Sequence, residues 1–339
     1  MYPYFRKLFF RLKPEQAHAL SLQLIRWAGM TYLGRSLLHL LFRPPLRPVQ
    51  VFGLKFKNPI GLAAGYDKDG LGWRGLACLG FGHIEIGTIT PEPQAGNPLP
   101  RLFRLPEEAA LINRMGFPGK GSRFVARQLT GHRPADLILG VNLGKNKDTP
   151  LEEAANDYLS LYDQFAPLAD YLVINVSSPN TVGLRRLQAR ENLEQLLTTL
   201  AERCRQQQDQ IGRHVPLLVK LAPDLTLAEL EDALGAITMT GMDGVIATNT
   251  TISREELSSS DLANEAGGLS GKPLRARSTQ VIRQISQLTG QQLPIIGVGG
   301  ISSAASVQEK LDAGAVLVQV YTGLVFEGPG LVKRILEEL

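Results

Sequence analysis

We predict an α/β fold for this sequence, a (β/α)₈ TIM barrel with an N-terminal helical hairpin extension. After Pro48, eight short apolar runs alternate with helical stretches such as ASVQEKLDAGA. Alternating βα units with buried parallel strands form a closed barrel or an open doubly wound sheet, and eight units favour the barrel. A length of 339 residues suits one such barrel with an appendage. The runs occupy residues 59–66, 83–90, 137–144, 171–178, 216–223, 243–250, 293–300 and 315–322.

Two parts are expected along the chain: an amphipathic helical segment over residues 1–47 and the barrel over residues 48–339. The net charge of +4 is unevenly divided between them, since residues 1–47 hold eight basic residues and Glu15 as their one acid, a net +7 that leaves −3 for the remainder. The basic character therefore belongs to the N-terminal segment. We expect no nucleic-acid partner.

The composition is that of a folded protein, with 44% apolar and 20% charged residues. Cys78 and Cys204 lack the paired spacing of metal ligands and are too few for a disulfide framework. Both are expected to be inert, in a reducing compartment. No HxxxH, CxxC or carboxylate cluster is present, so no catalytic metal is expected.

The N-terminal segment is predicted to form two helices. Pro14 suits a first helical turn, and Ala17, Leu20, Leu24 and Trp27 then share one face. A second helix through TYLGRSLLHLLF ends at Arg43-Pro44-Pro45.

No apolar run is long enough to span a membrane, and the start lacks the cleavage site of a signal peptide. A basic, amphipathic, aromatic-rich hairpin is typical of a segment that lies on an anionic membrane surface. The alternative is a helical pair packed on the barrel, and the two Leu-rich faces favour the membrane interpretation.

Polar residues gather at the carboxyl ends of the predicted strands, where TIM barrels carry their chemistry. The stretch VINVSSPNTVGLR illustrates this, since an apolar strand leads directly into Asn, Ser and Thr residues. An ordinary Asn/Pro/Gly turn would explain this stretch alone, but the same pattern recurs around the barrel. The strand-end residues are Lys68, Thr88, Asn142, Asn175, Lys220, Thr248, Asn249, Gly299, Gly300, Tyr321 and Thr322.

The ligand of this ring is expected to carry a phosphate. The glycines of GVGGI follow the seventh strand, and the loops after strands seven and eight often hold a phosphate in such barrels. Glycine in GxGG also makes turns, so the position in the barrel gives the motif its weight. The neutral amides and hydroxyls of the other strand ends suit a polar heterocycle.

Two lysines in strand-end positions leave the chemistry open. Lys68 or Lys220 could form a Schiff base, as in a metal-independent aldolase or isomerase acting on a sugar phosphate, or could serve as a fixed cation beside developing negative charge. An ion pair with Asp67 or Asp69 is the structural alternative for Lys68. A non-catalytic membrane-binding protein would leave the strand-end amides unexplained.

Many ordered motifs resemble those of one enzyme family: NPIGLAAGYDKDG, FGHIEIGTITPEPQAGNPLPRLFRL, NRMGF, VNLGKNKDTP, NVSSPNT, VIATNTT, GGLSGKPL, PIIGVGGI and LVQVYTG. They look like the quinone-dependent, class 2 dihydroorotate dehydrogenases, and the similarity covers essentially the whole chain. The resemblance implies an FMN-containing (β/α)₈ barrel that oxidises dihydroorotate to orotate in UMP synthesis and passes the electrons to a membrane quinone.

The resemblance also implies site residues. Ser178, the second serine of NVSSPNT, becomes the catalytic base, and Lys68 the second catalytic residue, which polarises the substrate carbonyl region. FMN is expected to contact Ala64, Gly65, Thr88, Asn142, Asn175, Lys220, Thr248, Gly271, Gly300, Tyr321 and Thr322. The substrate is expected to contact Lys68, Asn113, Arg114, Met115, Gly116, Phe117, Asn175, Asn180, Asn249 and Thr250.

The sequence departs from the family pattern in two places. Pro118, Gly119 and Lys120 follow NRMGF where a pair of asparagines is common, which puts the shape of this substrate loop in question. Tyr66 stands where leucine is frequent.

For the quinone site, the resemblance implies His18, Arg104 and Tyr321 at the polar end of an apolar tunnel formed by the N-terminal helices. Arg104 in a salt bridge at the barrel rim and His18 as an exposed helical residue are the alternatives. We expect a peripheral membrane protein at the cytoplasmic face of the inner membrane, monomeric, with dihydroorotate, orotate and a quinone as its partners.

Overall fold

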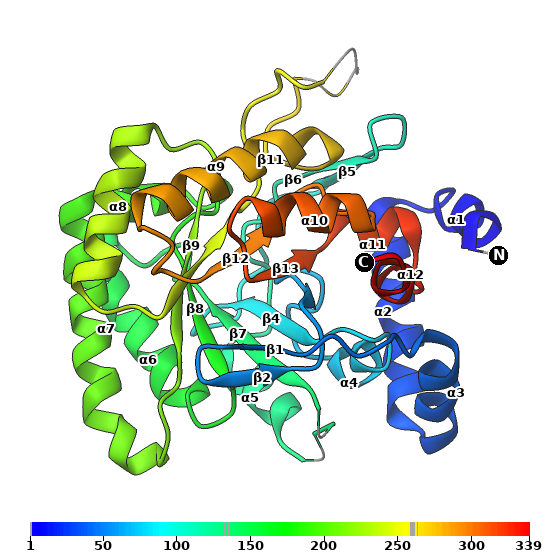
Figure 1. Ribbon diagram of the computed structural model, residues 1–339, viewed down its shortest axis with the longest axis horizontal. Coiled ribbons are helices and arrows are strands. Elements are labelled where there is room, and N and C mark those ends of the chain that lie inside the picture. The colour runs from blue at the N-terminus through cyan, green and yellow to red at the C-terminus, as the bar shows by residue number, and fades with distance from the viewer. Residues whose placement is uncertain (1, 132, 135, 258–261, 263) are drawn as a thin grey trace.

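A closed barrel of eight parallel strands forms the centre of the molecule (Figure 1). The computed structural model describes residues 2–131, 133–134, 136–257, 262 and 264–339. All eight predicted strands are present, in chain order around the barrel, and the eighth pairs with the first. They are β3 (Ile60–Leu62), β4 (His83–Ile89), β7 (Ile138–Leu143), β8 (Tyr171–Asn175), β9 (Leu217–Leu221), β10 (Gly244–Ala247), β12 (Ile295–Val298) and β13 (Leu317–Val320).

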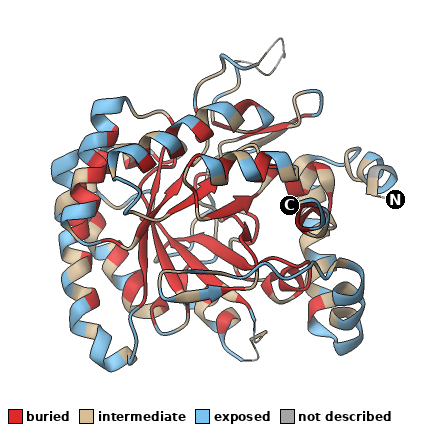
Figure 2. Ribbon diagram, in the orientation of Figure 1, coloured by how far each residue is buried: buried red, intermediate tan, exposed pale blue. Residues whose placement is uncertain are grey.

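Helices surround the strands and bury one face each against them (Figure 2). In α8 (Leu227–Met239), Thr226 and Glu229 form a capping box, and Leu230, Ala233 and Ile237 then recur on the buried side. The helices that follow the first strand are α4 (Trp73–Ala77), α5 (Ser122–Leu129), α6 (Ala154–Phe165), α7 (Arg190–Ile211), α8 (Leu227–Met239), α9 (Arg275–Leu288), α10 (Ala304–Asp312), α11 (Thr322–Glu327) and α12 (Leu331–Glu338), with 3₁₀ turns at Leu151–Glu153, Leu184–Gln188 and Lys272–Leu274.

A short antiparallel hairpin closes the end of the barrel opposite the predicted site. It consists of β1 (Val49–Val51) and β2 (Leu54–Phe56). Phe56 is fully buried in the cluster inside the barrel, together with Tyr171 and Leu317, which begin their strands. The hairpin therefore covers the amino-terminal ends of the strands and leaves the carboxyl ends for ligands.

A three-stranded antiparallel sheet was not expected from the sequence. It joins β5 (Leu102–Leu105) and β6 (Ala110–Asn113) to β11 (Gly268–Gly271), so that Asn113 pairs with Gly268. Two segments far apart in the chain thus meet at the carboxyl end of the barrel.

The N-terminal segment forms three helices on one side of the barrel, α1 (Tyr2–Phe9), α2 (Pro14–Met30) and α3 (Tyr32–Phe42) (Figure 1). The two predicted helices are α2 and α3, and α3 ends directly before Arg43 as predicted. The helix over the aromatic start, α1, was not predicted.

The face of α2 that the sequence pattern selects is not its docking face. Leu20, Leu24 and Trp27 are 44%, 47% and 65% exposed, whereas Leu22 and Ile25 pack against the barrel. Leu20 and Trp27 lie on the outside of the molecule, in agreement with the membrane interpretation, whereas Ala17 and Leu24 of the same predicted face line a cavity between the N-terminal helices and the barrel. None of the helices in the described part of the chain is long and apolar enough to cross a bilayer.

Candidate active site

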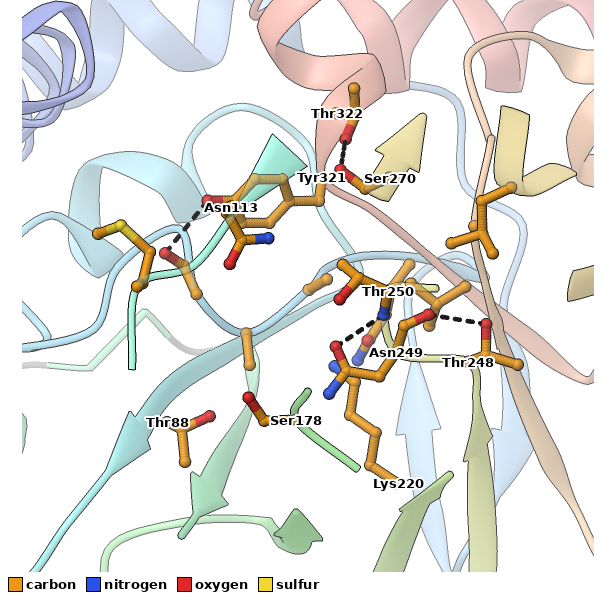
Figure 3. Close-up of a pocket in the computed structure, with 18 of the residues that line it drawn as sticks. Thr88, Asn113, Ser178, Lys220, Thr248, Asn249, Thr250, Ser270, Tyr321 and Thr322 are labelled. Carbon is orange, nitrogen blue, oxygen red and sulfur yellow. Dashed lines mark hydrogen bonds between the residues drawn. The ribbon is translucent and has the colours of Figure 1, made fainter. Parts of the chain in front are cut away.

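A cavity opens at the carboxyl ends of the barrel strands, with about 970 Å³ of empty volume including its open mouth (Figure 3). It contains nearly all the residues expected to bind cofactor and substrate. Those that line it are Ala64, Gly65, Lys68, Thr88, Asn113, Met115, Gly116, Phe117, Asn175, Ser178, Asn180, Lys220, Thr248, Asn249, Thr250, Gly271, Gly300, Tyr321 and Thr322.

Ser178 lies in the loop that follows β8 and is 5% exposed. Its Oγ accepts a hydrogen bond from the Asn180 backbone N–H at 3.3 Å. Thr181 follows three residues later in the same loop. Its hydroxyl is buried and has no hydrogen-bond partner among the described residues. The loop therefore presents one hydroxyl to the cavity and keeps a second, unpaired hydroxyl within the same turn.

Arg185 anchors this serine loop, a role that sequence reasoning missed. Its guanidinium donates to the carbonyls of Ser177 at 3.1 Å and Thr250 at 3.0 Å. A further N–H donates to Asp224 at 2.8 Å. One arginine thus ties the loop after β8 to the loops after β9 and β10, because its planar fork offers several donors at once.

A network of amides supports the floor of the cavity. The Asn175 amide nitrogen donates to Thr88 Oγ1 at 2.9 Å and to Asn142 Oδ1 at 3.0 Å. Asn142 itself does not line the cavity but holds these two side chains from behind. On the substrate side, Asn180 donates to Asn113 Oδ1 at 3.2 Å, which links the serine loop to the three-stranded sheet.

Lys68 is not held by the ion pair that its neighbours suggested. Its Nζ donates to the Gly65 carbonyl at 2.7 Å. Asp67 accepts instead from the backbone N–H groups of Leu71 and Gly72, and Asp69 accepts from that of Lys120. Burial lowers the pKa of Lys68 to about 8, partly opposed by Asp69, so the ammonium form predominates at neutral pH.

Lys220 points into the cavity from β9 (Figure 3). Its Nζ lies 3.8 Å from Oε1 of Glu85, a fully buried carboxylate that sequence reasoning missed. The signal was present, because Glu85 is the one acidic residue in the apolar run HIEIGTIT. Burial lowers the pKa of Lys220, and Glu85 opposes that effect.

The glycine loop after β12 borders the opposite end of the cavity. Gly299 and Gly300 have φ of 131° and 69°, and a Cβ on Gly300 would lie 2.4 Å from Cβ of Arg275. Glycine is therefore required here by backbone conformation and by the approach of α9, rather than by the ligand alone. Ser270 and Thr322, whose hydroxyls are 2.8 Å apart, stand beside this loop, and Ser270 was not predicted.

The substrate loop after β6 brings Met115, Gly116 and Phe117 to the cavity, but not Arg114. Arg114 forms an ion pair with Glu265 and lies over the Phe103 ring. Lys120 belongs to the segment Pro118-Gly119-Lys120, where the sequence departs from the family pattern. Its ammonium group lies 4.5 Å from the centre of the Phe124 ring.

A second cavity, largely apolar and about 1260 Å³ in empty volume, lies between the N-terminal helices and the barrel. His18, Arg104 and Tyr321 all line it. Tyr321 lines both cavities, so its side chain stands between them. Its hydroxyl donates to the carbonyl of Gly65, which lines the first cavity, at 3.4 Å.

The predicted polar residues of the second cavity have partners of their own. The Arg104 guanidinium donates to the carbonyls of Phe9 and Leu12 and lies over the Phe10 ring, so it also holds the carboxyl end of α1. His18 packs edge-on against Tyr66, with 5.0 Å between ring centres. Burial lowers the pKa of His18 to about 4, so it is neutral.

Comparison with known proteins agrees with this geometry. The family model described as dihydroorotate dehydrogenase matches residues 47–339. The chain belongs to the dihydroorotate dehydrogenase family. Members of this family are flavin-dependent oxidoreductases.

Curated relatives named dihydroorotate dehydrogenase (quinone) are similar over nearly their full length. The protein from Azotobacter vinelandii is 48% identical over 100% of this chain and 96% of its own, and that from Cellvibrio japonicus is 50% identical over 98% and 96%. A solved structure of ligand-free DHODH from Eimeria tenella superimposes with a TM-score of 0.87 at 39% identity, covering 96% of this chain and 93% of that chain.

The first cavity of this dihydroorotate dehydrogenase family member fits a flavin mononucleotide by its donor set. Backbone amides of the glycine loop, with the Ser270 and Thr322 hydroxyls, suit a phosphate. At the other end, Lys220 offers a cation, and the buried Gln319 Oε1 has no partner among the described residues. A ring with alternating donors and acceptors needs such a mixed set. Within the described residues, no group of three or more His, Cys, Asp or Glu could hold a metal ion.

Proposed function

We propose that this protein oxidises dihydroorotate to orotate in pyrimidine biosynthesis, with a quinone as electron acceptor and FMN as the bound cofactor. The main support for the proposal is that Tyr321 lines both cavities and is hydrogen-bonded to Gly65 of the first. A polar cavity with a serine loop lies on one side of Tyr321, and an apolar cavity lies on the other. Such a pair of cavities suits a polar substrate and an apolar acceptor that never meet.

The substrate would be held by the amides and by Lys68. Asn113, Asn180, Asn249 and Thr250 offer neutral donors and acceptors for the carbonyl and ring N–H groups of dihydroorotate. The ammonium group of Lys68 would face the negative charge of the substrate. Fixed donors of this kind hold a substrate in a reactive orientation without reorganisation.

Ser178 would act as the base at carbon 5 of dihydroorotate. Its Oγ takes the C5 proton, and the hydroxyl proton passes on to a neighbouring group or water, because a serine hydroxyl by itself is a weak base. Thr181, with its buried and unpartnered hydroxyl, is our candidate for that neighbour. Arg185 keeps the loop in place while this transfer occurs.

FMN would be held by Ala64, Gly65, Thr88, Asn175, Lys220, Thr248, Gly271, Gly300, Tyr321 and Thr322, with Asn142 as support behind Thr88 and Asn175. When bound, the flavin supplies a two-electron acceptor for the substrate and a donor for the quinone. Lys220 would place its positive charge beside the flavin.

The quinone would enter the second cavity, with His18, Arg104 and Tyr321 at its inner end. We assign residues 1–47 to a membrane- and quinone-associated segment and residues 48–339 to the catalytic barrel. The exposed side chains of Leu20 and Trp27 support peripheral attachment to the membrane. We further propose that the attachment is to the cytoplasmic face of the inner membrane and that the protein is a monomer.

The test is the visible absorption spectrum of the purified protein, repeated anaerobically after adding dihydroorotate. We expect a flavin spectrum that bleaches with dihydroorotate and recovers with a quinone. A flavin that stays oxidised would contradict the substrate assignment and the role of Ser178. A colourless protein that cannot be reconstituted with FMN would contradict the whole proposal.

A further inference from the structure

The interior of the barrel contains a carboxylate that the proposed mechanism does not use. Glu85 on β4 is fully buried beneath the first cavity. Its oxygens accept hydrogen bonds from the amide nitrogens of Asn142 and Gln319, both at 2.7 Å, and from the Tyr171 hydroxyl at 3.4 Å. Lys220 Nζ lies 3.8 Å away. Burying a charge costs free energy unless the charge is paired and hydrogen-bonded, so the role of Glu85 is to be sought in the groups that it contacts.

Glu85 orients the amides above it. An ionised carboxylate can only accept hydrogen bonds, so the Asn142 nitrogen must face Glu85 and the Asn142 oxygen must face the other way. There it accepts from the Thr88 hydroxyl at 2.6 Å and from the Asn175 nitrogen at 3.0 Å. One carboxylate therefore fixes the orientation of Asn142, and through it the hydrogen bonds that Thr88 and Asn175 donate to the Asn142 oxygen.

Glu85 is also the charge that opposes the desolvation of Lys220. Burial lowers the pKa of Lys220, and the attraction of Glu85 raises it. Among the described residues packed around Glu85, Tyr171 and His83 are neutral, because burial raises the pKa of Tyr171 far above its usual range and lowers that of His83 to about 3. The His83 ring packs against the Tyr171 ring, with 6.3 Å between ring centres, and Tyr171 in turn donates to Glu85. Lys68 lines the same cavity as Lys220, and burial lowers its pKa to about 8.

We propose that Glu85 is a positioning residue that keeps Lys220 protonated at the floor of the cavity, so that the charge of Lys220 beside the bound flavin stays constant with pH. The inference rests on the proposed function only in requiring FMN in this cavity. It concerns a residue that touches neither substrate nor the cavity surface, since Glu85 acts through Lys220 and Asn142.

The test is the midpoint potential of the bound flavin as a function of pH, measured anaerobically with redox dyes on the FMN-loaded full chain. In Glu85→Gln, Lys220 loses the attraction that holds its proton and should titrate within the measured range. We expect an additional bend in the plot of potential against pH that the wild type lacks. The additional bend should disappear in the double variant Glu85→Gln/Lys220→Met, because Lys220 is no longer present to titrate, whereas the titration of Lys68 is common to the wild type and both variants.

Tyr171→Phe is the matched control, since it removes a hydrogen bond to the same carboxylate but leaves the charge, and its profile should follow that of the wild type. If Glu85→Gln fails to retain FMN, the same measurement is made on Glu85→Asp. The shorter side chain weakens the attraction on Lys220 without removing it, so a bend absent from the wild type is again expected. A wild-type profile in the variant that retains FMN, or a bend that persists in the double variant, would overturn the inference.

The potential measurement needs no dihydroorotate. A flavin that dihydroorotate does not reduce would therefore contradict the substrate assignment without affecting the Glu85 inference. An unchanged plot of potential against pH in Glu85→Gln would contradict the Glu85 inference without affecting the substrate assignment. A wild-type chain that takes up no FMN would overturn both.

Discussion

The contact between α2 and α4 gives a perturbation that separates the two half-reactions. Gly29 of α2 lies against Gly75 of α4. A Cβ at Gly29 would be 2.4 Å from the Gly75 backbone N, whereas ordinary van der Waals contacts begin at 3.4 Å. Gly29→Ala therefore requires α2 to move by about 1 Å, because backbone atoms cannot rotate away as a side chain would. Overpacking of this kind destabilises the packed arrangement of α2 on α4 by about 1–3 kcal/mol, which corresponds to roughly 5- to 150-fold in the equilibrium constant for that packing.

Because α2 lines the second cavity and not the first, the effect should fall on the quinone step. We expect kcat/KM for a soluble quinone analogue to fall by a factor within that range, measured at steady state. Anaerobic stopped-flow reduction of the flavin by dihydroorotate should keep its wild-type rate.

Gly235→Ala in α8 is the matched control, since a Cβ there meets nothing within 4 Å. It reports the gain in helix propensity alone, about 1 kcal/mol, which the Gly29 variant shares. Equal quinone kinetics in the two variants would refute the idea that the docking of α2 shapes the quinone cavity. Equal slowing of both half-reactions in Gly29→Ala would refute the separation of the two cavities.

Three further predictions concern the site itself. Ser178→Ala should slow flavin reduction by about 10²- to 10⁴-fold while FMN stays bound, and loss of FMN would instead assign the serine a structural role. Since burial lowers the pKa of Lys68 to about 8, its positive charge is lost as pH rises through that value, so KM for dihydroorotate should rise above pH 8. In Lys68→Met that rise should be absent and KM high throughout, whereas a persisting rise would assign the titration to another group. Deleting residues 1–45 should abolish quinone reduction but spare flavin reduction by dihydroorotate, and unchanged quinone kinetics would contradict the assignment of the second cavity.

Much of the fold could be predicted because the signals are local. Eight apolar runs and the helices between them appear in the order and number of the observed barrel. The sheet of β5, β6 and β11 could not be predicted in this way, because Asn113 pairs with Gly268 across 155 positions of sequence. No local pattern specifies which distant strand a short apolar segment will meet.

The candidate site shows the same division. Residues at strand ends, such as Thr88, Asn175 and Lys220, converge because parallel strands end on one side of a barrel. Arg114 is adjacent in sequence to Asn113, yet its side chain pairs with Glu265 outside the cavity. The direction of that side chain depends on a partner that the local sequence does not reveal.

The periodicities, the helix and strand order, and the polar residues at the carboxyl ends of the strands can all be read from the chain alone. The folded molecule was needed to show which apolar face of α2 is buried, that Arg104 holds α1, and that Glu85 pairs with Lys220. Period and propensity act between neighbours in the chain, whereas burial and charge pairing depend on the groups that the fold brings into contact.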